Sequence, residues 1–154
     1  MTKYATIDEV MKTLYDCISG PPGGQDWTRD REIYHPKALI NRTRIVDGEP
    51  AIFSFTYDEF VEATIPLLAG QSFYEIEIGR KTDLFGQIAH VYSSYEARET
   101  PDHPEIQFRG VNMVHLWNDG TNSAGRPNGR WWIMAMIWDN EREGVDLPKA
   151  WLGT

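Results

Sequence analysis

The stretch "RWWIMAMIWD", residues 130–139, contains eight consecutive apolar residues, from Trp131 to Trp138, in a chain that is otherwise markedly polar. A helix needs about 20 apolar residues to cross a membrane, so this run is too short for that role. In a strand, successive side chains point to opposite faces of the sheet. Both faces of such a strand are apolar here, and each has to be covered.

The segments around this strand carry clear helix and strand signals. Thr6 with Glu9, and Thr56 with Glu59, form capping boxes that mark helix starts, and Asp26 can cap a short helix between them. The pattern predicts helices over residues 7–18, 27–35 and 57–70, and strands over residues 38–46, 72–81, 87–99, 105–117 and 130–139. This order predicts an α+β fold with an antiparallel sheet.

Length and charge narrow the class of protein. The 154 residues predict one domain, residues 1–154, in which residues 141–154 form a C-terminal tail. A net charge of −8 argues against nucleic acid and against an anionic membrane surface as partners. One cysteine, Cys17, rules out an intramolecular disulfide and a zinc site made of cysteines alone. No charged-then-apolar leader is visible, so we expect a cytoplasmic protein.

Residues 23–40, "GGQDWTRDREIYHPKALI", carry a family resemblance, which is most specific at Asp26-Trp27 and at "YHPKALI". With the order of elements from Thr6 to Asn140, they resemble the nuclear transport factor 2-like superfamily, which includes polyketide cyclase-like proteins, ketosteroid isomerases and scytalone dehydratases. The resemblance implies a strongly curved antiparallel sheet that forms a cone closed by three N-terminal helices over a cavity. The superfamily also contains non-enzymatic binding proteins, so it implies a pocket rather than a reaction.

The catalytic residues of these relatives are mostly missing. By this resemblance, the general-base aspartate of a ketosteroid isomerase falls at Arg42 and its protonated aspartate at Met113. The strand histidines of scytalone dehydratase fall near Phe73 and Gly110. Trp138 matches a pocket tryptophan of the isomerases. We therefore expect neither named reaction in its known form.

Strict alternation predicts which residues share each face of the last two strands. The resemblance assigns Trp132, Met134, Met136 and Trp138 to the concave, cavity face. An exposed apolar sheet face usually marks an interface. We therefore predict a homodimer through the convex face, formed by the alternate residues Trp131, Ile133, Ile137, Val114 and Leu116.

The "TPDHP" turn, residues 100–104, predicts the register of the hairpin that it joins. If the hairpin is centred between Asp102 and His103, opposite residues pair as Glu96–Arg109, Tyr95–Gly110, Val91–Val114, Tyr92–Met113 and His90–His115. We place the last two pairs on the concave face. Two imidazoles there could act as general base and acid near neutral pH, but a hydrogen-bonded pair that only shapes the pocket is the more frequent arrangement.

The sequence thus predicts a small-molecule pocket rather than a defined reaction. The candidate catalytic residues are His90 and His115, and the pocket residues are expected to be Tyr15, Trp27, Arg42, Tyr92, Met113, Met134, Met136 and Trp138. Methionine and tryptophan suit a small apolar or aromatic ligand. We expect no metal and no cofactor. Two functions stay open: a cofactor-independent acid–base enzyme (an isomerase, dehydratase or cyclase) acting on a small cyclic molecule, and a non-catalytic ligand-binding or dimerisation module.

Overall fold

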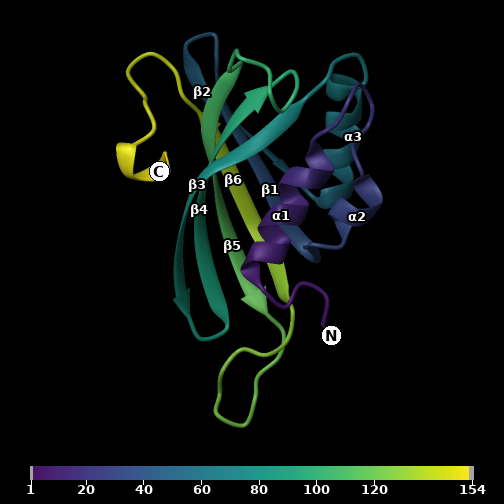
Figure 1. The fold of residues 1–154 in the computed structure, drawn as a ribbon, viewed down its shortest axis with the longest axis vertical. Helices are drawn as coiled ribbons and strands as arrows, with labels where there is room; N and C mark the ends of the chain where they lie inside the picture. The colour runs from purple at the N-terminus through teal and green to yellow at the C-terminus, as the bar shows by residue number, and fades with distance from the viewer. Residues whose placement is uncertain (1, 153–154) are drawn as a thin grey trace.

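A computed structural model describes residues 2–152 of the chain. Three helices pack on one face of a curved six-stranded sheet (Figure 1). The helices are α1 (Ile7–Ile18), α2 (Trp27–Arg31) and α3 (Tyr57–Leu68). The strands are β1 (Tyr34–Val46), β2 (Glu49–Phe55), β3 (Tyr74–Phe85), β4 (Ile88–Arg98), β5 (Phe108–Asn118) and β6 (Trp131–Asn140). The α+β class is therefore confirmed.

The strand order is β2-β1-β6-β5-β4-β3, and β1 and β6 form the one parallel pair of the described sheet. The apolar strand β6 thus lies inside the sheet, with a hydrogen-bonded neighbour along each of its edges. No helix of the described residues is long and apolar enough to cross a membrane.

The helix starts follow the capping boxes. Thr6 and Glu9 cap α1 reciprocally, and Thr56 and Glu59 do the same for α3. Asp26 accepts a hydrogen bond from the backbone N–H of Arg29 and caps α2. These side chains satisfy backbone donors at the first turn of each helix, so the local sequence suffices to set these boundaries.

Some predicted boundaries were wrong, and one strand was not predicted. The second helix ends at Arg31, and the chain is already in strand β1 at Tyr34. Residues 49–55, which the sequence pattern does not assign to a strand, form β2, an edge strand that pairs antiparallel with β1. β2 is mostly exposed, so its apolar positions do not give the clear alternation of a half-buried strand.

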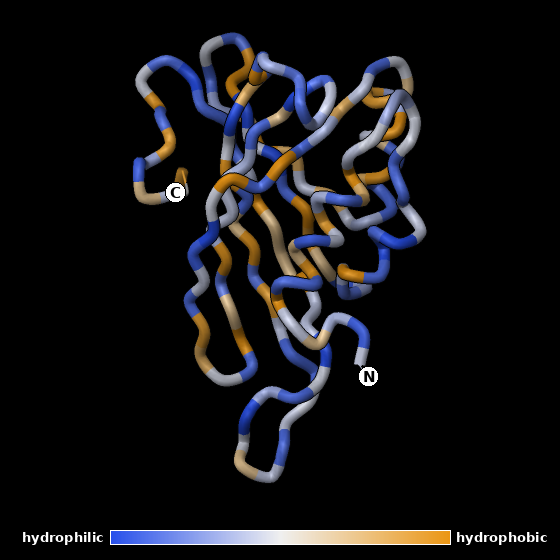
Figure 2. Tube along the Cα trace, in the orientation of Figure 1, coloured by the Kyte–Doolittle hydropathy of each residue, from blue (hydrophilic) through white to orange (hydrophobic). Residues whose placement is uncertain are grey.

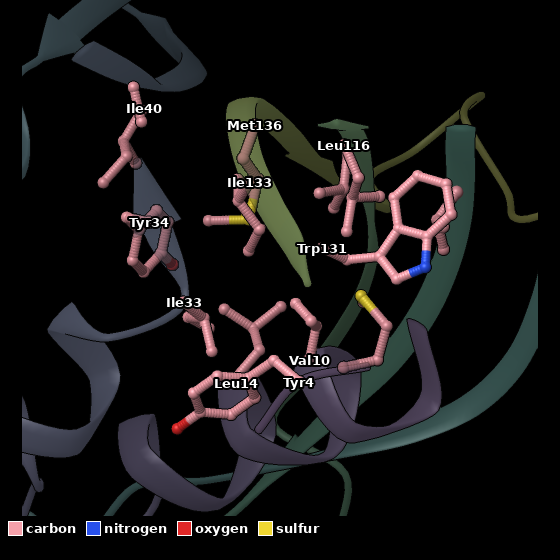
Figure 3. Close-up of a cluster of buried hydrophobic side chains, with 14 of the residues drawn as sticks. Tyr4, Val10, Leu14, Ile33, Tyr34, Ile40, Leu116, Trp131, Ile133 and Met136 are labelled. Carbon is pink, nitrogen blue, oxygen red and sulfur yellow. The ribbon is translucent and has the colours of Figure 1, made fainter. Parts of the chain in front are cut away.

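The hydrophobic core lies between α1 and the sheet (Figure 3). Val10 and Leu14 of α1 face Leu116 of β5 and Ile133 of β6, and all four side chains are at most 5% exposed. In Figure 2 the apolar residues accordingly follow the central strands. The face of the sheet that carries these residues is called the inner face below, and the opposite face the outer face.

The hairpin register predicted from the "TPDHP" turn is confirmed. His90 lies opposite His115, Tyr92 opposite Met113, and Val91 opposite Val114. Glu96 also lies opposite Arg109, but the ion pair expected between them does not form. Arg109 Nε instead contacts Glu141 Oε1 at 2.8 Å, and Arg98 contacts Glu96 at 2.9 Å.

The predicted faces of β4 and β5 were wrong. Val91, Val114 and Leu116 belong to the core under α1, so the alternate residues His90, Tyr92, Met113 and His115 point to the outer face. The prediction followed from the resemblance, which assigns Trp132, Met134, Met136 and Trp138 to the cavity face. The apolar residues decide the face instead, because α1, α2 and α3 all pack on the inner face.

A β-bulge breaks the alternation in β6. His115 pairs with Ala135 whereas Leu116 pairs with Ile133, so Met134 is an extra residue on β6. As a result Trp131 and Ile133 lie on the same inner face as Met136 and Trp138, whereas Trp132 lies on the outer face.

The convex surface predicted for the homodimer was wrong at four of its five residues. Trp131, Ile133, Val114 and Leu116 lie in the core and are at most 5% exposed. Ile137, at 42% exposed, lies on the outer face as predicted.

Candidate active site in the cavity

A cavity of about 370 Å³ lies between the inner face and the helices. Its walls are mainly apolar and come from α1, α3 and the strands: Leu14, Ile18, Phe55, Phe60, Leu68, Phe73, Phe108, Met136 and Trp138. Phe60 of α3 packs edge-on against Trp138 of β6, with 6.0 Å between the ring centroids. Polar side chains interrupt these walls at a few points: Asp30, Arg42, Glu75, Tyr95, Asn112 and Asn140. An apolar cavity with a few convergent polar groups is typical of a ligand site.

Asp30 is the most deeply buried carboxyl of the cavity. It lies on α2 and is 2% exposed. Tyr57 Oη donates a hydrogen bond to its Oδ2 at 2.8 Å, whereas its Oδ1 has no hydrogen-bond partner within residues 2–152. Burial raises the pKa of Asp30 to about 7, although the bond from Tyr57 opposes the shift. Asp30 can therefore hold or release a proton near neutral pH, with one oxygen free for a ligand.

Glu75 of β3 is a second carboxyl in the same cavity. Protein atoms surround the Glu75 side chain, but it is only half-buried because part of its surface faces the cavity. Burial raises the pKa of Glu75 to about 7, and hydrogen bonding from Asn112 opposes the shift. Two carboxyls in one cavity thus titrate near neutral pH, which is the range that general acid–base catalysis requires.

A polar network under α1 holds Asn112 in place. Tyr15 Oη lies 2.6 Å from Ser93 Oγ, and Asn112 Nδ2 donates to Tyr15 Oη at 3.1 Å. Ser93 in turn hydrogen-bonds Glu77. Burial raises the pKa of Tyr15 far above its ordinary value, so its hydroxyl stays protonated. Tyr15 therefore supports the polar side of the cavity from behind.

The structure brings together only part of the predicted pocket. Arg42, Met136 and Trp138 line the cavity. Tyr15 and Trp27 lie directly behind its lining, where Trp27 packs edge-on against Phe60 at 6.1 Å between ring centroids.

The other predicted residues lie on the outer face. His90 and His115 are neighbours, with ring centroids 4.5 Å apart, and they line a shallow groove with Met134. Tyr92 packs against His90 at 4.5 Å, and Met113 lies opposite Tyr92. The histidine pair thus exists as predicted, but the thickness of the sheet separates it from the cavity. Burial and the neighbouring His115 lower the pKa of His90.

Sequence reasoning missed both cavity carboxyls. Asp30 stands in a short helix with several exposed charged residues, so nothing in its neighbourhood marks it as buried. Glu75 is a polar residue between Tyr74 and Ile76 in a predicted strand. Alternation there does not say which of the two faces is the inner one, so Glu75 was not recognised as a cavity residue. Among residues 2–152, no group of three histidine, cysteine or acidic side chains is arranged to hold a metal ion.

The described part of the C-terminal tail, up to Leu152, lies on the outer face rather than over the cavity. A short 3₁₀ helix, Lys149–Trp151, contacts β3 and β4. The Trp151 ring packs on Tyr92 with 5.3 Å between centroids, and Ser94 Oγ donates to the Trp151 carbonyl oxygen. In Figure 1 the tail passes along the side of the sheet opposite the helices.

Comparisons with known proteins agree with this architecture. The sequence matches no family model and no curated protein. In structure, the chain is similar to an NTF2-like protein of unknown function from Shewanella baltica, with a TM-score of 0.58. The two sequences are 15% identical, and the match covers 88% of this chain and 91% of the Shewanella chain. This chain is also similar to a proposed dehydratase of the NTF2-like family from Streptomyces avermitilis, with 10% identity, 90% and 96% covered, and a TM-score of 0.59.

A third similar structure is the β subunit of a proposed aromatic-ring-hydroxylating dioxygenase from Novosphingobium aromaticivorans, with 10% identity, 98% and 96% of the two chains covered, and a TM-score of 0.65. Identities this low speak for the fold and not for a shared activity. The resemblance inferred from residues 23–40 is confirmed at that level: the chain has the fold of the nuclear transport factor 2-like superfamily.

Proposed function

We propose that this protein binds a small, largely apolar cyclic molecule in the cavity and acts on it by acid–base chemistry that uses Asp30 and Glu75. The observation that carries the proposal is that two buried carboxyls, each with its pKa raised to about 7, line one apolar cavity. Near neutral pH, one carboxyl in its ionised form can accept a proton while the other, in its protonated form, donates one.

The cavity walls support a flat ligand. Trp138 and Phe60 offer aromatic surfaces, and Met136 can adapt its shape to a bound ring. The free Oδ1 of Asp30 supports direct contact with a ligand, because a buried polar atom without a partner is costly unless something binds it.

Proton exchange on a simple carbonyl compound tests this proposal. 2-Tetralone is a flat bicyclic ketone, and its α-protons exchange with D₂O when a base removes one and a deuteron is returned to the enolate. We expect the protein to accelerate this exchange at pH 7, as followed by NMR. Asp30→Asn and Glu75→Gln should each lower the acceleration by roughly 10²- to 10⁴-fold, the usual contribution of a general acid or base.

His90→Gln and His115→Gln are the matched controls, since both lie on the outer face and should leave exchange unchanged. Loss of exchange in either would restore the histidine hypothesis and contradict the present one. Binding of 2-tetralone without any exchange would instead favour the non-catalytic ligand-binding module. If neither 2-tetralone nor the two naphthalene probes described below bind, the cavity is refuted as a ligand site.

We further propose that the protein forms a homodimer through the outer face. Leu39 of β1, Trp117 of β5 and Ile137 of β6 are 51%, 38% and 42% exposed, and they lie on neighbouring strands of this face. A second copy is the occupant best suited to this sheet face, because the same apolar surface can pair with itself across a two-fold axis. One similar structure is itself a subunit.

Light scattering on the purified protein tests the dimer. We expect a dimer at micromolar concentration, and we expect Ile137→Asp to give a folded monomer because it places a charge in the centre of the interface. Glu62→Asp, on the exposed side of α3, is the control. A wild-type protein that is monomeric under these conditions would refute this second proposal.

A further inference from the structure

Among the described residues that line the cavity, Arg42 is the only arginine. It lies on β1, where Phe53 of β2 is its partner on one side and Trp138 of β6 its partner on the other. Its guanidinium lies 5.4 Å from the centre of the Phe53 ring. The sheet therefore presents one cation to the cavity, directly beside the aromatic wall.

Within residues 2–152, no carboxylate pairs with this cation. Arg80, Arg98 and Arg109 each form an ion pair with an acidic side chain, but Arg42 forms none, and its Nε is buried without a hydrogen-bond partner. The chain has an excess of eight negative charges, so potential partners are abundant. Burial, and then the nearby Arg44, lower the pKa of Arg42, which reflects the cost of an uncompensated charge.

The chemistry of the cavity indicates which kind of anion would bind the unpaired guanidinium of Arg42. The planar guanidinium donates two parallel hydrogen bonds and so matches a planar carboxylate. A doubly charged phosphate is disfavoured, because Asp30 and Glu75 line the same cavity and would repel it when ionised. A single arginine therefore favours a single negative charge.

We propose that the ligand is a flat, apolar carboxylate whose charged group binds the Arg42 guanidinium while its ring system lies against Trp138. This inference rests on the proposed function, since it assigns the substrate class of the same cavity. It places the carboxylate at the β1 end of the cavity. Arg42 then fixes which part of the ring faces the buried carboxyls.

Matched probes separate charge from shape. 2-Naphthoate and 2-naphthamide have nearly the same size and shape, but only the first carries a charge at pH 6. Isothermal titration calorimetry should show 2-naphthoate binding roughly tenfold to hundredfold more tightly than 2-naphthamide, the range expected for a charge-assisted hydrogen bond in a partly buried site. Arg42→Gln should remove this preference and leave the affinity for 2-naphthamide nearly unchanged.

Two further variants make the result specific. Arg44→Gln removes a neighbouring exposed positive charge on the same strand, and it should keep the preference for the carboxylate. Arg42→Lys keeps the positive charge but loses the planar guanidinium that donates two parallel hydrogen bonds. It should therefore show a preference for 2-naphthoate that is intermediate between those of the wild-type protein and Arg42→Gln. Circular dichroism of each variant checks that it is folded.

The outcomes separate the two proposals. If the wild-type protein binds 2-naphthamide as tightly as 2-naphthoate, or if Arg42→Gln keeps the preference, the inference is refuted while the cavity remains a ligand site. If neither naphthalene probe nor 2-tetralone binds, the proposed function itself fails, and the inference with it.

Discussion

Replacing Asp30 with asparagine should stabilise the protein increasingly as the pH rises. In the folded chain burial raises the pKa of Asp30 to about 7, from an ordinary value of 3.8. Well below pH 3.8 the carboxyl is protonated in both the folded and the unfolded state, so it adds no pH dependence. Between pH 4 and pH 7 the unfolded chain releases this proton while the folded chain keeps it, and the stability of the wild-type protein falls as the pH rises.

The size of the effect follows from the difference in pKa. A difference of about 3 corresponds to about 4 kcal/mol of unfolding free energy once the pH exceeds the folded-state value, at about 1.4 kcal/mol per pKa unit. Between pH 5 and pH 8 the advantage of Asp30→Asn should therefore grow by about 3 kcal/mol. The amide oxygen can still accept the hydrogen bond from Tyr57 Oη, so the variant keeps the local structure.

Urea denaturation followed by tryptophan fluorescence measures this difference. The unfolding free energy of the wild-type protein and of Asp30→Asn would be determined at pH 5, 6, 7 and 8. Asp47→Asn, in the exposed turn between β1 and β2, controls for the loss of one negative charge. If the difference between Asp30→Asn and the wild-type protein is the same at pH 5 and pH 8, the assignment of a buried, proton-holding carboxyl is refuted.

Three more changes test other parts of the structure. Glu75→Gln should raise the unfolding free energy above that of the wild-type protein by more at pH 8 than at pH 5, because burial raises the pKa of Glu75 to about 7. The same difference from the wild-type protein at both pH values would contradict this. Ile133→Ala should cost roughly 2–5 kcal/mol in urea denaturation, since the side chain is fully buried, and a cost below about 1 kcal/mol would mean that it faces solvent. Gly110→Ala should lower the melting temperature, because the new Cβ would lie 2.5 Å from the carbonyl oxygen of Asp139; an unchanged melting temperature would contradict this close approach.

Local sequence determined the helix starts and one strand register. The capping boxes at Thr6 and Thr56 set where α1 and α3 begin, because they act within four residues. The "TPDHP" turn joins β4 and β5 closely enough that the chain itself fixes which residues lie opposite one another. The resemblance at Asp26-Trp27 correctly indicated the fold.

Only the tertiary structure decided which residues face the cavity. The extra residue Met134 shifts β6 by one position, which brings Trp131 and Ile133 to the same face as Met136 and Trp138. A bulge depends on the neighbouring strand, so alternation within one segment cannot reveal it. The burial of Asp30 likewise depends on α3, since Tyr57 reaches it with a hydrogen bond from a distant part of the chain. A carboxyl changes its pKa only through such surroundings, and for this reason the candidate chemistry became visible only in the folded protein.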